Sequence, residues 1–322
     1  MKQNAVKTFA ILILISINLF LAISLSNQQK QIRYYDESLV NSTVENMKAN
    51  GMIADASLIP RRRESFSILE GVYKDDAIYA AAKRFIPSGE LTAYALPTGS
   101  LYFTDAEGSY ARFYRNLYFE FCAADFSDVL VAIRSGASEP VAVADVLDSV
   151  TEEFFAVGGN QEEGGFTLSA DNVMYYAEYD VYTVKCRQIA DGLPVYGFAP
   201  EVYIKDGAVK AAEGKWCFST PKSKINAETQ DVISILINES GRLRTEYKAA
   251  QKDDPDALMP AYMVSGINAN YYIFSDDDGN IYFVPVYVIS YKDRSGSVYN
   301  TVNGKMISLT SEDTSGGEQT KD

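Results

Sequence analysis

Residues 182–216 read YTVKCRQIADGLPVYGFAPEVYIKDGAVKAAEGKW, and this stretch decides the fold class. Its dipeptide Asp206-Gly207 lies between two β-like runs. An Asp-Gly pair in that position is a strong signal for a β-hairpin, because both residues tolerate the left-handed backbone that a tight turn requires. The stretch therefore predicts a strand, a hairpin and a second strand that continues to Trp216.

Similar signals extend outward in both directions. Strands are predicted from 91 to 134, from 164 to 216 and from 259 to 306, with further hairpin turns at Asp278-Gly279 and at 294–296. Apolar spacing and stop signals predict helices at 37–50, 75–85, 141–155 and 227–239. Strands and helices mixed in this way predict an α+β protein whose helices cover antiparallel sheets.

A weak internal repeat suggests the domain organisation. Pro-Val-Tyr occurs at 194–196 and at 285–287, each time before a predicted strand and hairpin and after a predicted helix. We therefore expect tandem helix-plus-antiparallel-sheet modules, the first over 31–137 and the second over 138–308. The second module contains the whole repeat, so it is expected to fold alone. The polar residues 309–322 are predicted to be a disordered tail.

The N-terminal segment predicts a membrane helix. Residues 9–25 read FAILILISINLFLAISL without a charge, which is near the lower limit of about 17 residues for a bilayer span. Lys2 and Lys7 precede the run. The positive-inside rule then places residues 1–8 in the cytoplasm, a single transmembrane helix at 9–26, and the bulk of the chain outside the cytoplasm.

Two questions about this segment stay open. Small residues at 22–24 and 24–26 also fit cleavage of a signal peptide, although the apolar run exceeds the usual length of about 7–15 residues. Asn18, Ala22 and Ser26 fall on one face of the helix. Small and polar residues often mediate contacts between membrane helices, so this face is the predicted partner-binding site. The alternative is an amide that the membrane anchor merely tolerates.

Composition excludes several kinds of chemistry. The 322 residues include no histidine, which excludes Ser-His-Asp and Cys-His catalysis and histidine ligation of metals. The net charge of −14 disfavours nucleic acid as a partner. The stretch 275–279 resembles the start of a calcium loop but lacks its first and last ligands. We therefore predict no catalytic residue, no cofactor and no metal site.

Three further features allow two interpretations each. Cys186 and Cys217 either form a disulfide or remain free thiols, and Cys122 is most simply a core residue. The basic cluster of Arg61, Arg62 and Arg63 either meets lipid phosphates or an acidic partner, or is a solvated loop. The 23 tyrosines indicate half-exposed sheet faces or protein contacts, and sheet packing is the simpler interpretation.

The stretch 182–216 is similar to the strand, hairpin and strand segment of the YycI/YycH group of regulatory proteins. The predicted membrane helix, the helix around 227–239 and the closing stretch VPVYVISYKDRSGSVYNTVNGKM at 284–306 resemble other parts of that group. The same pattern is also similar to PepSY-type modules. The resemblance covers the membrane helix and residues 140–307, whereas 31–137 matches only in general arrangement.

The resemblance implies a non-enzymatic role. Proteins of this group regulate a membrane sensor histidine kinase that responds to the cell wall, through contacts of their membrane helices and often together with a sister YycH-like protein. The implied function is thus a membrane-anchored extracytoplasmic regulator of a two-component system. Two alternatives stay open: a PepSY-type inhibitor or chaperone of an exported peptidase, and a secreted enzyme that acts on the cell wall.

Overall fold

The structure is a computed structural model that describes residues 34–72, 75–87, 90–97, 99–136, 139–143, 154, 166–218, 223–256, 258–276 and 280–309. The chain divides into two compact units, each assembled from several segments. Unit 1 comprises the described residues of Met1–Phe66, Glu228–Asn268 and Tyr287–Met306. Unit 2 comprises those of Ser67–Ala227, Ala269–Val286 and Ile307–Asp322.

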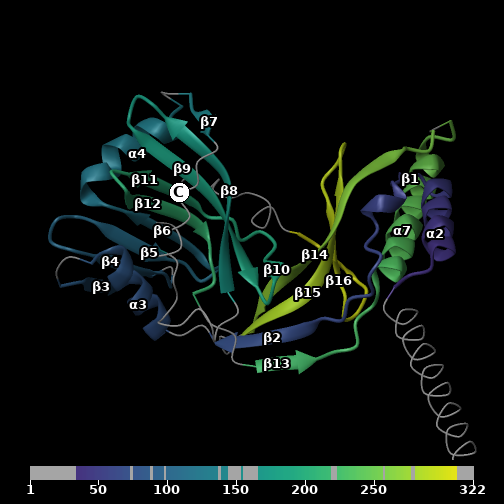
Figure 1. Ribbon diagram of the computed structural model, residues 1–322, viewed down its shortest axis with the longest axis horizontal. Coiled ribbons are helices and arrows are strands. Elements are labelled where there is room, and N and C mark those ends of the chain that lie inside the picture. The colour runs from purple at the N-terminus through teal and green to yellow at the C-terminus, as the bar shows by residue number, and fades with distance from the viewer. Residues whose placement is uncertain are drawn as a thin grey trace, which may run out of the picture. The chain divides into compact units, whose positions relative to one another are not determined.

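Unit 1 contains two helices that pack side by side, α2 (Glu37–Ala49) and α7 (Val232–Asp253) (Figure 1). Each helix begins after an aspartate whose carboxylate accepts a hydrogen bond of 2.9 Å from a backbone N–H of the first turn, Asp36 for α2 and Asp231 for α7. Such caps satisfy amides that have no partner inside the helix. Both helix starts are therefore specified by local sequence.

The strands of unit 1 belong to a sheet with the order β1-β14-β15-β16-β17. β1 runs parallel to β14, and the long strands β14 and β15 contribute residues to both units. A short 3-10 helix, η1, follows β1. The elements are β1 (Met52–Ile53), η1 (Ala56–Leu58), β14 (Tyr262–Ser275), β15 (Asn280–Tyr291), β16 (Ser297–Asn300) and β17 (Met306–Ile307).

Unit 2 contains a ten-stranded sheet with the order β3-β4-β5-β6-β12-β11-β9-β8-β7, in which β10 also pairs with β9. Neighbouring strands of this sheet pair in antiparallel fashion. The strands are β3 (Thr92–Ala95), β4 (Leu101–Thr104), β5 (Tyr110–Phe113), β6 (Tyr118–Cys122), β7 (Val141–Val143), β8 (Phe166–Tyr176), β9 (Val181–Ala190), β10 (Leu193–Pro194), β11 (Glu201–Lys205) and β12 (Ala208–Lys215). The sheet that contains β14 and β15 has seven strands in all, because β2 (Ser67–Val72) pairs with β15 and also with β13 (Ser223–Asn226).

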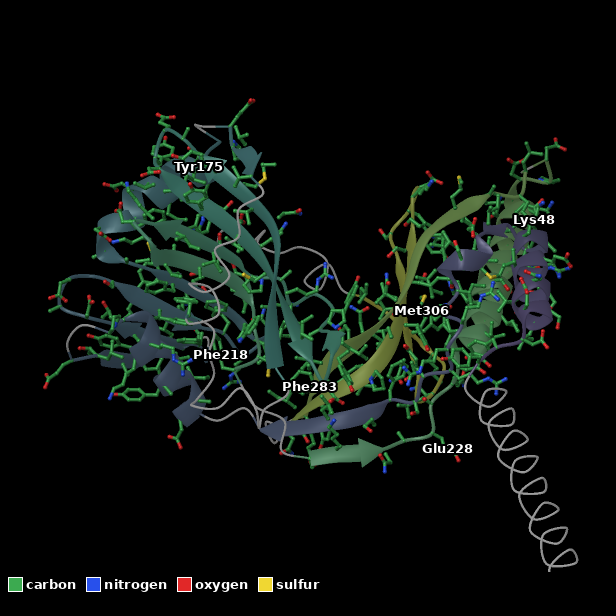
Figure 2. The ribbon with its side chains drawn as sticks, viewed as in Figure 1. Lys48, Tyr175, Phe218, Glu228, Phe283 and Met306 are labelled. Carbon is green, nitrogen blue, oxygen red and sulfur yellow. The ribbon has the colours of Figure 1, made fainter. Side chains whose placement is uncertain are left out.

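Helices cover both faces of the ten-stranded sheet. On one face, α3 (Asp75–Phe85) packs into an aromatic core in which the ring of Phe85 stacks on Phe154 with centroids 4.3 Å apart. On the other face, η2 (Ala124–Phe126) and α4 (Ser127–Arg134) pack against a smaller cluster. Phe218 and Phe283, both labelled in Figure 2, belong to the aromatic core and to a third cluster of unit 2, respectively.

The predicted α+β class with antiparallel sheets is confirmed, as are the helices near 37–50 and 75–85. The hairpin at Asp206-Gly207 is also confirmed, because it joins the paired strands β11 and β12. The helix predicted at 227–239 is present as α7, which begins five residues later in the chain, at Val232, and continues to Asp253. All of these features depend on caps, turns or periodicity that local sequence provides.

Other predicted elements are wrong. The β-like stretch 91–134 ends in a helix, α4, whose buried Leu130 and Ile133 pack on the sheet. The predicted helix 141–155 is wrong at its start, because Val141–Val143 pair with β8, whereas Phe154 is helical; residues 144–153 and 155 lie outside the described part of the chain. The two Pro-Val-Tyr copies also differ, since the first leaves the two-residue strand β10 and the second lies inside β15.

The expected module boundary at residue 137 does not coincide with the division into units. β6, from the first expected module, pairs with β12, from the second, over Tyr118–Cys122 and 211–215. Unit 1 likewise joins α2 from the first expected module to α7 from the second. The modules are therefore interleaved along the chain, because long-range strand pairing and helix packing decide which segments form one unit.

In the part of the chain that the structure describes, no helix is both long enough and apolar enough to cross a membrane. The predicted membrane helix at 9–26, with Asn18, Ala22 and Ser26, lies outside the described residues, as do residues 310–322 of the predicted tail. The membrane helix stays a prediction.

Candidate functional site

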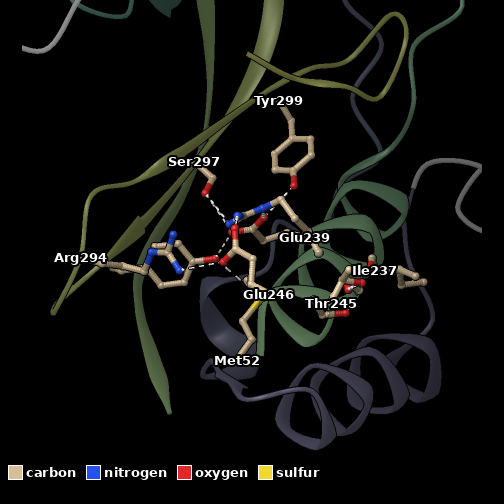
Figure 3. Close-up of polar contacts among 12 residues, drawn as sticks. Met52, Ile237, Glu239, Thr245, Glu246, Arg294, Ser297 and Tyr299 are labelled. Carbon is tan, nitrogen blue, oxygen red and sulfur yellow. Dashed lines mark hydrogen bonds and ion pairs between the residues drawn. The ribbon is translucent and has the colours of Figure 1, made fainter. Parts of the chain in front are cut away.

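A buried carboxylate in unit 1 is surrounded by polar side chains from α7, β15 and β16 (Figure 3). Glu239, in the middle of α7, has an exposed fraction of 0%. Its Oε1 accepts hydrogen bonds from Tyr291 Oη at 2.6 Å and Ser297 Oγ at 2.8 Å, and its Oε2 accepts one from Tyr299 Oη at 2.6 Å. The guanidinium of Arg242 donates to both oxygens, at 2.8 and 2.7 Å. The carboxylate thus ties α7 to β15 and β16.

The electrostatics of this centre favour a structural role. Burial alone would raise the pKa of Glu239, but hydrogen bonds from Arg242, Tyr291 and Tyr299 outweigh burial and lower the pKa to about 2. Burial and the neighbouring carboxylate raise the pKa values of Tyr291 and Tyr299. An ionised carboxylate that accepts five hydrogen bonds has little capacity left for a substrate or for proton transfer. We therefore assign this centre to stability rather than to catalysis.

One face of the unit 2 sheet carries a row of tyrosines. Strand pairing places Tyr94 opposite Tyr102, Tyr102 opposite Arg112, and Arg112 opposite Glu120, across β3, β4, β5 and β6. Residues directly opposite each other share a face of the sheet. Because side chains alternate along a strand, Tyr110, Tyr114 and Tyr118 are directed to this same face. We call Tyr94, Tyr102, Tyr110, Arg112, Tyr114 and Tyr118 the tyrosine face.

These side chains contact one another in two groups, Tyr94 with Tyr102 and Tyr110, and Arg112 with Tyr114 and Tyr118. The ring centroid of Tyr102 lies 6.3 Å from that of Tyr94 and 6.0 Å from that of Tyr110. The guanidinium of Arg112 lies 4.5 Å above the ring of Tyr114. Tyr94 remains 51% exposed at the edge strand β3. The opposite face of these strands faces the aromatic core with α3. On the tyrosine face, α4 packs on β6, β9, β11 and β12, and Tyr110 packs against the edge of this α4 cluster.

Three glutamates continue the row beyond the tyrosines. Glu120, Glu213 and Glu201 lie opposite one another on β6, β12 and β11. Glu213 accepts hydrogen bonds from Tyr118 Oη at 3.2 Å and from Arg134 Nε, at the end of α4, also at 3.2 Å. Burial raises the pKa values of Glu120 and Glu201. The row therefore passes from aromatic and basic groups to partly buried acids.

The structure places the predicted cluster of Arg61, Arg62 and Arg63 on the surface of unit 1, and all three residues are exposed. The guanidinium of Arg63 lies 5.1 Å from the ring centroid of Tyr35. The carbonyl of Arg61 accepts a hydrogen bond of 2.9 Å from the Tyr35 N–H. Tyr35 thus contacts both the backbone of Arg61 and the side chain of Arg63. Binding of a partner to this cluster stays a prediction.

The remaining candidates do not form a reactive site as far as the structure describes them; residues 277–279 of the stretch that resembles a calcium loop lie outside the described residues. Cys122, Cys186 and Cys217 are buried free thiols, so the open question about a disulfide is answered, and burial raises the pKa of Cys122 to about 11. Asp276 accepts a hydrogen bond from the Asn280 N–H at 2.8 Å and thereby stabilises a turn. Within the described residues, no group of acidic or cysteine side chains is arranged to hold a metal ion.

Sequence reasoning did not identify the tyrosine face. The signal was present in YARFYRNLYFEF at 110–121, where tyrosine or arginine recurs at every second position of β5. That spacing shows that the side chains share a face. It does not show that the same face lines up with Tyr94 and Tyr102, because the register between strands is a tertiary property.

Comparisons with known proteins show the fold alone. No protein-family model and no curated protein sequence matches the chain. Among solved structures, the chain is similar to an uncharacterized protein from Eubacterium rectale ATCC 33656, with 11% identity and a TM-score of 0.50, over 85% of this chain and 99% of that one. The Bacillus megaterium YpeB C-terminal domain matches with 12% identity and a TM-score of 0.27, over 73% of this chain and 96% of that one, which is too distant to carry an argument.

Proposed function

We propose that this protein is a non-enzymatic regulator, anchored in the cell membrane by residues 9–26, that modulates a membrane sensor histidine kinase through contacts outside the cytoplasm. The observation that carries the proposal is the tyrosine face. The resemblance of 182–216 and 284–306 to the YycI/YycH group, read from the sequence, supports the kinase as the partner. The absence of histidine from the sequence supports a role without catalysis.

Tyrosine and arginine side chains on one face of a sheet suit protein recognition. Tyrosine offers a large apolar ring with a hydroxyl at its end, and it loses little conformational entropy when it is held by a partner. Tyrosine, tryptophan and arginine are the residues that most often dominate binding energy at protein interfaces. In the tyrosine face, neighbouring rings and Arg112 already hold one another, so a partner would meet a largely preorganised surface.

Tyr94→Ala should weaken the association with the kinase by roughly tenfold or more, because Tyr94 is the most exposed ring of the face and is placed to be covered by a partner. The measurement is the amount of sensor kinase that co-purifies with the full chain from detergent-solubilised membranes, quantified by mass spectrometry. Tyr79→Ala is the matched control: Tyr79 is 42% exposed and lies on α3, which packs on the other face of the sheet. Equal recovery of the kinase with both variants would contradict the proposed surface.

Asn18→Leu should reduce the same association by about 3- to 30-fold, since a partner helix that satisfies an amide in hydrocarbon contributes roughly 0.6–2 kcal/mol. Leucine favours the bilayer centre, so insertion should be unaffected. Replacing residues 9–26 by an unrelated membrane helix should weaken the association further. If that replacement leaves the kinase fully bound at matched expression, the membrane helix does not contact the kinase. The tyrosine face or Arg61–Arg63 would then have to provide all of the contact.

Recovery of an exported peptidase instead of a kinase would favour the PepSY-type alternative.

A further inference from the structure

A pocket of about 140 Å³ lies within unit 2, beside the turn between β5 and β6. Its floor is apolar, because Leu117 and Phe198 line it and are buried. Half-buried tyrosines form part of its wall: Tyr196 and Tyr272, whose rings stack with centroids 6.5 Å apart. The pocket therefore offers a planar or apolar group an apolar surface beside two stacked aromatic rings.

Basic and amide residues also line the pocket, and the Arg115 guanidinium packs against Gly99, which lies next to it in the fold. Arg115 and Asn116 are exposed lining residues, and Lys215 is a half-buried one. Among the described residues that line the pocket, none is Asp or Glu. The ionisable side chains of the lining, apart from the tyrosines, are therefore basic, although the whole chain has a net charge of −14. A site of this kind attracts an anionic group, and the planar fork of an arginine favours a carboxylate.

The backbone at the pocket is held in a conformation that costs free energy. Leu117 has a φ of +65°, in the left-handed region that a leucine rarely adopts. Its N–H donates to the Tyr114 carbonyl at 3.1 Å, and its own carbonyl accepts from the Trp216 N–H at 3.0 Å. These bonds fix the turn that carries Arg115 and Asn116. Backbone strain that the surroundings maintain is often found at binding sites.

We propose that this pocket binds an aromatic carboxylate, with the ring on Leu117 and Phe198 and the carboxylate at Arg115 and Lys215. The pocket volume of about 140 Å³ fits one aromatic ring, because an apolar cavity of about 150 Å³ holds one benzene molecule. The ligand is either a free small acid or the C-terminal residue of a peptide, since both present the same chemistry. This inference goes beyond the proposed regulatory function and does not depend on a kinase being the partner.

Trp216 provides the readout. It is the one tryptophan of the chain, it is buried, and it adjoins Lys215. Its fluorescence should change when the full-length protein is titrated with N-acetyl-phenylalanine. N-acetyl-phenylalanine amide, which keeps the ring but lacks the charge, should bind about tenfold more weakly or worse, and acetate, which lacks the ring, should also bind more weakly. Calorimetry of the same titrations confirms binding independently of the fluorophore.

Variants locate the site. Arg115→Gln and Lys215→Gln should each weaken binding of N-acetyl-phenylalanine by about tenfold, whereas Arg61→Gln, an exposed arginine of unit 1, should leave binding unchanged. Because the acid and the amide are compared on the unmodified protein, the test holds even if a variant folds poorly. Equal binding of acid and amide, equal binding of inorganic phosphate, or no binding of the acid in the millimolar range would overturn the proposal.

A last comparison identifies the source of the ligand. A short peptide that ends in phenylalanine is titrated with a free and with an amidated C-terminus. If the free peptide binds more tightly than N-acetyl-phenylalanine and the amidated one does not bind, the pocket takes a peptide C-terminus. If the free peptide binds no better than N-acetyl-phenylalanine, the pocket takes a small acid. Both results support an aromatic carboxylate site, and neither depends on recovery of the kinase.

Discussion

A fragment of residues 138–308 should unfold without a cooperative transition, although its sequence repeat suggests an independent module. In this fragment β12 lacks its neighbour β6, so the backbone groups of residues 211–215 that face β6 lose their partners. The aromatic core also loses Phe85, Phe113, Phe119 and Phe121. In unit 1, α7 loses α2, against which it packs. Small domains have little net stability, about 5–15 kcal/mol, so these losses exceed what the fragment can tolerate.

The measurement is urea unfolding followed by far-UV circular dichroism and by Trp216 fluorescence. The matched control is a fragment of residues 34–309, which keeps the described elements of both units and should unfold cooperatively. Coincident, steep transitions for 138–308 by both probes would show that the second half folds alone and that the interleaved units are wrong.

Glu239→Ala should destabilise unit 1 by about 3–5 kcal/mol, since it removes the buried acceptor of three hydroxyl groups and the buried partner of Arg242, which keeps only the more exposed Glu246. Arg242 would lose its carboxylate, and the hydroxyls of Tyr291 and Tyr299 would lose the acceptor that lies 2.6 Å from each. The free energy of unfolding from urea titrations is the measurement. Glu246→Gln is the matched control: Glu246 lies two turns further along α7, also pairs with Arg242, and has a side chain 49% exposed, so its loss should cost less than about 1 kcal/mol. Similar losses for both variants would contradict a central role for Glu239.

The same carboxylate should make stability depend on pH in a defined direction. Its pKa is lowered from an ordinary value of 4.5 to about 2 in the folded protein. A lowered pKa contributes stability that is fully present above pH 4.5 and is lost as the pH falls towards 2, because the unfolded chain takes up the proton first. The wild-type protein should therefore lose roughly 3 kcal/mol from this group across that interval. The Glu239→Gln variant should be less stable than the wild-type protein at neutral pH. Its free energy of unfolding should also lack the decrease that protonation of Glu239 causes between pH 4.5 and 2.

Several features were determined by the sequence itself, because they depend on residues close together in the chain. The aspartate caps of α2 and α7, the helix over Asp75–Phe85 and the hairpin at Asp206-Gly207 are of this kind. A cap or a tight turn is stabilised by its own few residues whatever surrounds it. The absence of histidine, which excludes much of catalysis, also needs no structure.

Tertiary structure alone decided how these parts combine. The pairing of β6 with β12 joins residues about 90 positions apart, and no local pattern favours that partner over another strand of similar composition. The register of β3 to β6 then aligns Tyr94, Tyr102 and Arg112 into one face. The burial of Glu239 likewise depends on Tyr291 and Tyr299, which reach it from strands 52 and 60 residues away. The strand partners, the register and the burial of Glu239 are stabilised by apolar burial and hydrogen bonds between segments far apart in the chain. These interactions form only when the segments come together in the folded protein.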